Sequence, residues 1–538
     1  MKRSFRQLAA GPFDLLVIGG GIYGAWAAYD AALRGLSVAL IEAEDWGAGT
    51  SQASSKLIHG GLRYLEHRHF GLVRKSLDER RRLAWLGPHR VRPLRFVLPV
   101  YAGDRVGRLK LKLGLWLYDR MAGKGAEDVG YTEPLKREAL KQFDLRPEGL
   151  RGGFAFGDCQ TDDARFTLEI VDGALDAGAV AVNHARAVDL LVEHGRVRGA
   201  TVRDCESGAT CRVRAEATLN CTGAWARRLI EPHNDGFSSS MRLTKGVHLV
   251  MPALPQEQAF LLPSNDDGRI VFLTPWYGKT LLGTTDTEFT GDPDAVRVDE
   301  GDVVYLLERA RRLIPDGPWD RSDVISGFCG LRTLPDSSSR SPTQLSREWR
   351  LDQPLEGMLV AVGGKFTSAR ADAVVMVNRV MKMLNRELVP STTAQLLFPW
   401  APEGRFSYWR RTAMAQGLSL GLDEETAETL TLRFGTRIEA IFDRLRETPQ
   451  LAARVVEDAP FCRAEVVHAL SDEMALSLAD VLRRRVPVLL ISRMPEAALR
   501  DVTAMVASEL QWSPRRRERE LADLNAEFKP ALTSRGNI

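Results

Sequence analysis

The 538-residue sequence has little of three things that would each indicate a class of protein: paired cysteines, net charge and long apolar runs. Its six cysteines form no CxxC pair and no Cys/His spacing of metal ligands, so we expect reduced thiols, a reducing compartment and no metal site. A formal net charge of +3 gives no electrostatic support for nucleic-acid binding. The remaining composition, 44% hydrophobic and 27% charged, is that of a globular protein, and the length favours two or three domains.

One apolar stretch, "LLVIGGGIYGAWAAY" at residues 15–29, follows a basic start and could be mistaken for a secretion signal. The run is short, is bracketed by Asp14 and Asp30, and has a glycine cluster at its centre. A buried strand, turn and helix explain it better. Since no other stretch reaches spanning length, we expect no transmembrane segment.

The same stretch contains a nucleotide fingerprint. The apolar run "DLLVI" leads into G-x-G-x-x-G on Gly19, Gly21 and Gly24, the alanine-rich "AWAAYDAALR" follows as a helix, and "SVALI" is a second strand ending at Glu42. Gly19 permits the tight turn, Gly21 lets a pyrophosphate approach the backbone, and Gly24 allows close packing of helix and strand. Glu42 can accept from a ribose hydroxyl, which argues against NADP and leaves FAD and NAD.

Later segments favour FAD over NAD. "ATLNCTGAWARRLI" runs from a strand through Gly223 into a helix, and "GMLVAVGGKFTSARADAVVMV" has a turn at Gly364 before a helix that begins near Lys365. A nucleotide domain that is interrupted by a long insertion and resumed near residue 360 is typical of a flavoprotein. The second helix N-terminus can then stabilise negative charge on the reduced flavin.

These segments, together with further motifs, resemble one family, the FAD-dependent glycerol-3-phosphate dehydrogenases. The resemblance covers the N-terminal segment through "SSKLIHGGLRYLE" and the motifs "LYDRMAGK", "GDCQTDDARFTLE", "LTKGVHLV", "LLGTTDTEF", "GLRTL" and "VGGKFTSAR", in the family's order. It implies an α/β fold in which a Rossmann-like FAD-binding domain is interleaved with a mixed-sheet substrate-capping domain over residues 1–390. A linker at 391–404 and an all-helical C-terminal domain at 405–538 would follow.

The fingerprint and the resemblance together predict a set of FAD contacts. They are Gly19, Gly21, Gly24, Glu42, Thr50, Ser51, Ser54, Ser55, Lys56, Leu57, His59, Gly60, Gly223, Gly364, Lys365, Phe366 and Thr367.

The resemblance further implies oxidation of sn-glycerol 3-phosphate to dihydroxyacetone phosphate by hydride transfer to the flavin. A phosphorylated substrate needs cations, because arginine binds phosphate bidentately and lysine binds it as a point charge. The predicted substrate contacts are Arg63, Tyr64, Lys245, Thr285, Arg332, Arg347 and Lys365. The predicted catalytic residues are His248 as the first candidate for the base, His59 as the second, and Arg332. For an isolated HxxxR pair, solvation or bonding to local carbonyls would be the better explanation of His59 and Arg63, but the fingerprint upstream and the family resemblance favour a site.

The family also implies a membrane quinone as the electron acceptor and a cytoplasmic protein attached to the inner face of the cell membrane. The local candidate for attachment is the basic, apolar segment 105–124, with a core helix carrying a solvated basic edge as the alternative. A homodimer is the oligomeric state considered, and the sequence leaves it open.

Two other functions share these features. A flavin-dependent amine or amino-acid oxidase has the same nucleotide fold but needs one cation for a carboxylate, whereas this sequence offers several. A non-catalytic flavoprotein binding module is the third class; loss of Arg63, Arg332 or Lys365 would have favoured it, and all three are present.

Overall fold

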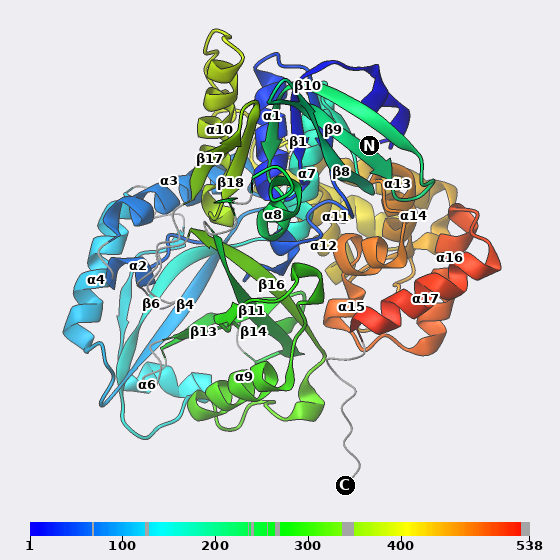
Figure 1. Ribbon diagram of the computed structural model, residues 1–538. Coiled ribbons are helices and arrows are strands. Elements are labelled where there is room, and N and C mark those ends of the chain that lie inside the picture. Colours follow the sequence, from blue (N-terminus) through cyan, green and yellow to red (C-terminus); the bar gives the residue numbers. More distant parts are fainter. Residues whose placement is uncertain are drawn as a thin grey trace.

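Two β-sheets and a group of C-terminal helices make up the chain in the computed structural model (Figure 1). The structure describes residues 1–66, 69–123, 129–234, 236–237, 241–255, 257–263, 269–335 and 349–528. No helix in these ranges has the length and apolarity of a membrane span.

The first sheet contains the predicted nucleotide-binding strands in the order β17-β18-β10-β1-β2-β7. The neighbouring strands from β18 to β7 are parallel, β17 is antiparallel to β18, and β8 and β9 extend β10 as an antiparallel meander. The strands are β1 Phe13–Ile18, β2 Val38–Ile41, β7 Val180–Val182, β8 Ala185–Glu193, β9 Arg196–Asp204, β10 Thr210–Asn220, β17 Arg350–Leu355 and β18 Met358–Val362. Strands more than 300 residues apart thus form one sheet, which confirms the interrupted nucleotide-binding fold.

Three helices cover this sheet because their apolar faces share one core with its strands. They are α1 Ile22–Leu33, α7 Asp163–Asp176 and α10 Ala369–Met383. α1 is apolar almost all round and is buried along its whole length, as expected of a helix between a sheet and two other helices.

The second sheet is larger and mostly antiparallel, with the order β15-β11-β14-β13-β12-β4-β6-β3; β16 also pairs with β11, and β5 with β6. Its strands are β3 Leu57–Ile58, β4 Arg92–Tyr101, β5 Glu133–Leu135, β6 Leu150–Gln160, β11 Met241–Pro252, β12 Ala259–Pro263, β13 Ile270–Trp276, β14 Lys279–Gly283, β15 Thr287–Phe289 and β16 Ser326–Pro335. The helices of this part are α2 Arg63–Glu66, α3 Phe70–Leu86, α4 Arg108–Ala122, α6 Arg137–Leu140 and α9 Glu300–Leu313, whereas α8 Ala226–Ile230 packs against strands of the first sheet.

The C-terminal helices, yellow to red in Figure 1, lie to one side of both sheets. They are α11 Phe406–Ser419, α12 Glu424–Phe434, α13 Ile438–Glu447, α14 Arg463–Asp472, the π-helical segment η12 Asp480–Arg485, α15 Val488–Ile491, α16 Glu496–Glu509 and α17 Pro514–Phe528. Their core includes Trp276 and Phe328 of the second sheet, so these helices are not an independent appendage.

Candidate active site

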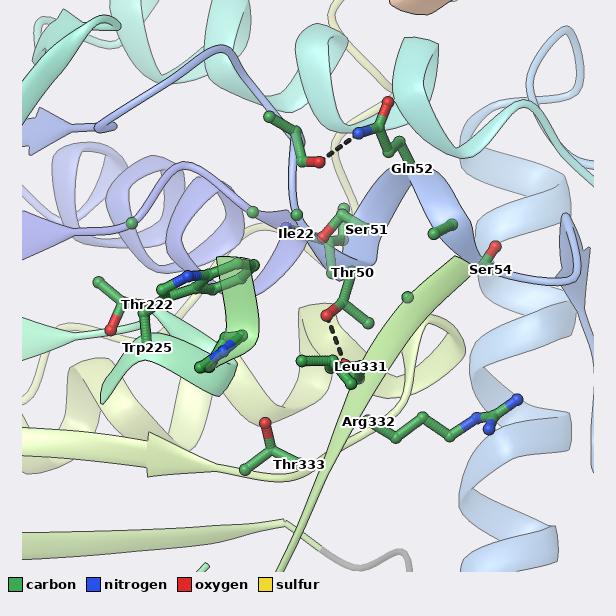
Figure 2. Close-up of a pocket in the computed structure, with 18 of the residues that line it drawn as sticks. Ile22, Thr50, Ser51, Gln52, Ser54, Thr222, Trp225, Leu331, Arg332 and Thr333 are labelled. Carbon is green, nitrogen blue, oxygen red and sulfur yellow. Dashed lines mark hydrogen bonds between the residues drawn. The ribbon is translucent and has the colours of Figure 1, made fainter. Parts of the chain in front are cut away.

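A cavity of about 1030 Å³ lies where residues of the two sheets meet. Four parallel strands of the first sheet end at it, since Ile18, Glu42, Cys221 and Gly363 all contribute to its wall. The carboxyl ends of parallel strands are where α/β proteins bind nucleotides. Figure 2 shows the opposite wall, where β16 presents Leu331 and Arg332 beside the 3₁₀ turn η2, Thr50–Ala53.

The glycine fingerprint forms the tight turn that its spacing predicts. Gly19 has φ +107°, and a Cβ there would lie 2.7 Å from the Cys221 carbonyl oxygen. A Cβ on Gly24 would lie 1.9 Å from the Gly19 carbonyl oxygen, so only glycine permits this approach of α1 to β1. A Cβ on Gly21 would meet only Ser51 Oγ, at 3.0 Å, because the rest of its surroundings is open. The turn therefore leaves room for a group that reaches the backbone at Gly21 and the N-terminus of α1, which fits a pyrophosphate.

Glu42 lies at the end of β2 with its carboxylate beside the same turn. It accepts hydrogen bonds from Gly20 N at 2.7 Å and from Glu44 N at 2.9 Å. Burial raises the pKa of Glu42 to about 7. A ribose hydroxyl that donated to this carboxylate would favour its charged form.

The turn before α10 forms another part of the wall. Gly364 has φ +112°, and a Cβ there would lie 1.9 Å from Tyr23 Oη, which itself accepts from Lys365 N at 3.1 Å. Thr367 Oγ1 accepts from His59 N at 3.2 Å, so this turn also holds the segment that carries His59. The Lys365 ammonium lies 3.6 Å from the centre of the Tyr64 ring and 3.5 Å from Ser76 Oγ.

His248 is buried in strand β11 as a neutral imidazole. Its Nε2 lies 2.9 Å from Ser55 Oγ, and its ring stacks on Phe328 with the centroids 5.1 Å apart. Burial, together with the charges of Arg332 and Lys56, lowers the pKa of His248 to about 3. Its Nδ1 is buried without a hydrogen-bond partner among the described residues, and such an atom calls for one.

Arg332 extends from β16, the neighbour of β11. Its Nη2 donates to Thr284 Oγ1 at 2.9 Å, and its Nη1 lies 3.2 Å from both the Thr285 carbonyl oxygen and Asp286 Oδ1. A Cβ on Gly246 of β11 would come within 2.2 Å of Arg332 Nη2, so this glycine makes room for the guanidinium. The guanidinium is therefore held on a rigid element, with its charge partly balanced by Asp286.

Most of the predicted site residues line this one cavity. They are Gly19, Gly21, Glu42, Thr50, Ser51, Ser54, Ser55, Leu57, His59, Tyr64, Gly223, His248, Arg332, Gly364, Lys365, Phe366 and Thr367. The residues that do not line it are Gly24, Lys56, Gly60, Lys245 and Thr285. Arg347 and the Arg63 side chain lie outside the described residues.

Two of the predicted lysines take part in ion pairs instead. Lys56 Nζ lies 2.5 Å from Asp163 Oδ1, with both side chains buried. Lys245 Nζ lies 2.5 Å from Asp299 Oδ2 and 2.6 Å from Asp302 Oδ2. Each charge is thus satisfied locally, and an effect of either lysine on a bound molecule would be indirect.

Sequence reasoning missed three residues that line the cavity, Trp225, Arg228 and Asp294. Trp225 Nε1 donates to Asp294 Oδ1 at 2.6 Å, and Arg228 Nη1 lies 2.8 Å from Asp294 Oδ2. The Trp225 ring is close enough to Gly49 that a Cβ there would lie 3.0 Å from it. The acidic "GDPD" before Ala295 was the available signal, but nothing local indicates that it reaches Trp225 and Arg228 on another element.

Comparison with known proteins gives matches over nearly the whole chain. The family model described as "FAD dependent oxidoreductase" matches residues 14–371, and "C-terminal domain of alpha-glycerophosphate oxidase" matches residues 391–517. The glycerol-3-phosphate dehydrogenase of Mycobacterium leprae is 33% identical, over 97% of this chain and 89% of its own. The aerobic glycerol-3-phosphate dehydrogenase of Bacillus subtilis is 31% identical, over 97% of this chain and 96% of its own. Among solved structures, the glycerol-3-phosphate dehydrogenase of Bacillus halodurans complexed with FAD is 26% identical with a TM-score of 0.80, over 99% of this chain and 97% of its own.

The fingerprint geometry predicts the effect of Gly21→Val. The valine side chain would fill the open space at this position, so we expect a folded protein that purifies with little or no FAD. The flavin absorbance per mole of protein measures this. Gly71→Val is the control, because a Cβ there meets nothing within 4 Å, and it should keep its full flavin content. A Gly21→Val protein with full flavin content would contradict the assignment.

Proposed function

The chain belongs to the FAD-dependent oxidoreductase family, and from this premise we propose that it oxidises sn-glycerol 3-phosphate to dihydroxyacetone phosphate and passes the electrons to a membrane quinone. FAD is the cofactor of this family, and the glycine turn, the Glu42 carboxylate and the cavity volume fit it. The proposal depends above all on one observation, that Arg332, Lys365 and the neutral His248 line a single cavity. Bound FAD would supply the acceptor for the hydride from the secondary carbon.

The cations of the cavity suit a phosphate dianion. Arg332 offers a planar guanidinium whose position is fixed by Thr284 and Asp286, and Lys365 offers a point charge from the turn before α10. An arginine on a rigid strand can hold a phosphate bidentately, which also fixes the orientation of the carbon to be oxidised.

His248 suits the removal of the hydroxyl proton because it is neutral at physiological pH. Its low pKa makes it a weak base in the protein alone, but a dianion beside Arg332 would offset the positive charge that disfavours its protonation. Ser55 Oγ and the stacked Phe328 ring would hold the imidazole in place during the transfer.

The reaction is tested by anaerobic bleaching of the purified yellow protein. Glycerol 3-phosphate should bleach the flavin absorbance, and D-amino acids should not. Bleaching by a D-amino acid alone would instead support the amine or amino-acid oxidase alternative.

We expect Arg332→Ala to lower kcat/KM for glycerol 3-phosphate by roughly two orders of magnitude or more, since a charge-assisted contact to the dianion is lost. Arg332→Lys should recover only part of this loss, because lysine restores the charge but not the fork. Steady-state kinetics with equal flavin content in each variant provide the measurement. Free glycerol, a poor substrate without phosphate, should hardly respond; an equal loss for both substrates would move the phosphate role to Lys365 or Arg63.

Replacement of the proposed base should act on the chemical step. His248→Gln should lower kcat and kcat/KM together by about 10²-fold or more, with FAD content unchanged. His59→Gln is the matched variant, since His59 lines the same cavity and is the second candidate. If His59→Gln shows the larger fall in kcat, the base is His59.

The membrane contact is proposed for helix α4, which has two different apolar faces. Its buried face contains Leu115, Tyr118 and Ala122, as a core helix requires. Leu109, Leu113 and Trp116 recur at i, i+4 and i+7 on the opposite face, and they are 83%, 64% and 56% exposed. Core packing accounts for the first face only.

Basic residues adjoin the exposed apolar face of α4. Arg108, Lys110, Lys112 and Arg120 are all exposed and lie between or beside the apolar positions. A helix with an apolar strip and cationic neighbours can lie in the interface of a membrane that contains anionic lipids. This arrangement supports a peripheral location at the inner face of the cell membrane, where a quinone is within reach.

We expect the double variant Leu113→Ser, Trp116→Ser to bind anionic liposomes much less than the parent protein, because about 0.8 kcal/mol is lost for each buried CH₂ removed. Co-sedimentation with vesicles and quinone reductase activity with added phospholipid measure the effect. Tyr408→Ser is the control, since Tyr408 is 68% exposed on a different helix, and it should bind normally. Unchanged binding of the double variant would leave α4 as a core helix with a basic edge.

A further inference from the structure

The segment from Glu42 to Gly47 supports both halves of the nucleotide-binding turn. Glu42 presents its carboxylate at the cavity, while Gly47 N donates to the Gly20 carbonyl oxygen at 3.0 Å. The buried Trp46 ring lies so close to the fingerprint that a Cβ on Gly20 would be 2.5 Å from it. The position of this segment therefore decides the position of the ribose-binding carboxylate and of the turn beneath the phosphates.

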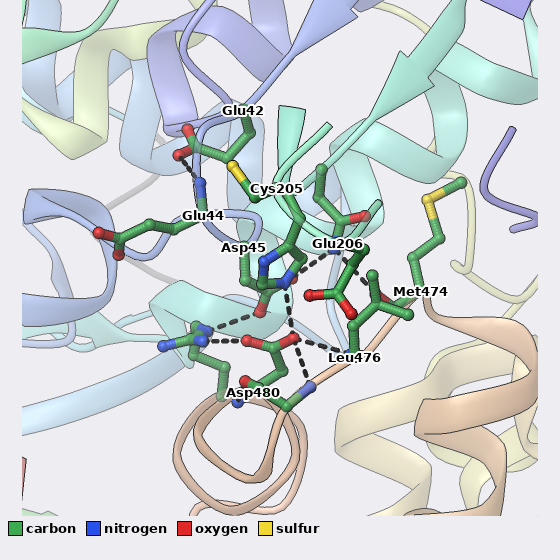
Figure 3. Close-up of polar contacts among 12 residues, drawn as sticks. Glu42, Glu44, Asp45, Cys205, Glu206, Met474, Leu476 and Asp480 are labelled. Atoms are coloured by element: carbon green, nitrogen blue, oxygen red, sulfur yellow. Dashed lines mark hydrogen bonds and ion pairs between the residues drawn. The ribbon is translucent and has the colours of Figure 1, made fainter. Parts of the chain in front are cut away.

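Asp45, in the middle of this segment, is fastened by the C-terminal helices. Its carboxylate is fully buried and accepts from Arg484 Nε at 2.6 Å and from Arg485 Nη1 and Nη2 at 2.7 and 2.8 Å. Both arginines belong to η12, more than 430 residues away along the chain. Figure 3 shows Asp45 and Asp480 facing one another, with Glu42 and Glu44 nearby.

A second connection runs through His184, the residue before β8. Its Nε2 lies 2.9 Å from Asp480 Oδ2, also in η12, and its backbone N–H donates to the Glu44 carbonyl oxygen at 2.6 Å. The next residue, Ala185, donates its N–H to the Glu42 carbonyl oxygen at 2.7 Å. Although burial opposes the charged imidazole, Asp480 raises the pKa of His184, and the pKa of Asp480 is lowered in turn. The Glu42–Gly47 segment is thus bound by η12 directly, at Asp45, and indirectly, through His184.

The C-terminal part of the chain also contributes to the cavity itself. Arg483 of η12 lines it, as do Asp523 and Ala526 of α17. Residues of η12 and α17 thus form part of the cavity wall together with Glu42 and Ala185.

We propose that η12 retains the cofactor: Asp480, Arg484 and Arg485 act as positioning residues that hold the Glu42–Gly47 segment in the shape that FAD requires. The C-terminal domain would then have a role in cofactor retention, although these three side chains bind Asp45 and His184 and not the flavin. This inference rests on FAD as the cofactor and is independent of the substrate and of the electron acceptor.

The competing explanation is that these buried ion pairs only contribute to stability or only join the domains. Breaking a buried pair by removing one partner destabilises a protein in any case. The test therefore needs substitutions that keep the charge or the shape, and a control pair between the same two parts of the chain.

Two variants of the holoenzyme meet this need. Arg485→Lys keeps a cation beside Asp45 but loses the two-pronged contact, and Asp480→Asn keeps the shape but loses the charge that holds His184. After dilution, FAD release is followed by the rise in flavin fluorescence. We expect release to accelerate about tenfold for Arg485→Lys, which corresponds to about 1.4 kcal/mol, and less in the same direction for Asp480→Asn. The rise in melting temperature on adding FAD to apoprotein should shrink in both variants.

Arg437→Met is the matched control. Arg437, between α12 and α13, pairs with Asp172 and Asp176 of α7 at 2.9 and 3.0 Å, so it also joins the C-terminal helices to the FAD-binding part but does not contact the Glu42–Gly47 segment. Its FAD release should equal that of the parent. The inference is overturned if Arg485→Lys and Asp480→Asn fold and release FAD at the parent rate, or if Arg437→Met accelerates release as much as they do. Because no substrate is present, failure here leaves the proposed oxidation untouched, and a failed bleaching test leaves this inference untouched.

Discussion

The close approach of α1 to β1 at Gly24 is the constraint on which the rest of the structure depends. With a Cβ only 1.9 Å from the Gly19 carbonyl oxygen, no other residue allows the helix to begin where it does. The helix N-terminus and the turn at Gly21 then face the cavity at the carboxyl ends of β1, β2, β10 and β18. Every other part of the site is arranged around this fixed edge.

On the side of the second sheet, glycines on the adjacent strands β11 and β14 leave space for two larger side chains of the site. A Cβ on Gly283 of β14 would lie 2.1 Å from the His248 ring, and Gly246 of β11 gives room to Arg332. Backbone pairing sets His248 opposite Phe328, and Thr244 opposite Arg332. The imidazole and the guanidinium are therefore positioned by strands and not by loops, which gives the precision that a reacting site needs.

Features that depend on neighbouring residues could be predicted from the sequence, whereas contacts between residues far apart in the sequence could not. The fingerprint is a local pattern, so its strand, turn and helix were predictable from spacing alone, as was helix α4 within 105–124. The resemblance to a family extended the prediction to segments near His248, Arg332 and Lys365, which the structure gathers at one cavity. The ion pairs of Lys56 and Lys245 could not be predicted, because their partners Asp163, Asp299 and Asp302 lie more than 50 residues away in sequence. The contact of Asp45 with Arg484 and Arg485 depends in the same way on tertiary packing that no local pattern encodes.

With His248 as the proposed base and Arg332 as the proposed phosphate ligand, the electrostatics of the cavity would connect substrate binding with proton removal. Burial, Arg332 and Lys56 all disfavour a charged His248, while Lys56 is already paired with Asp163 and Arg332 lies beside Asp286. A dianion that bound Arg332 would offset the positive charges near the imidazole, while the effect of burial would remain. The pKa of His248 would therefore rise when substrate is bound and stay low when it is absent. On this proposal, a base that is neutral at rest and strengthened by the substrate's own phosphate would need no carboxylate partner. Such an arrangement would make the phosphate contribute to the chemical step as well as to binding, as expected when binding energy is realised in the transition state.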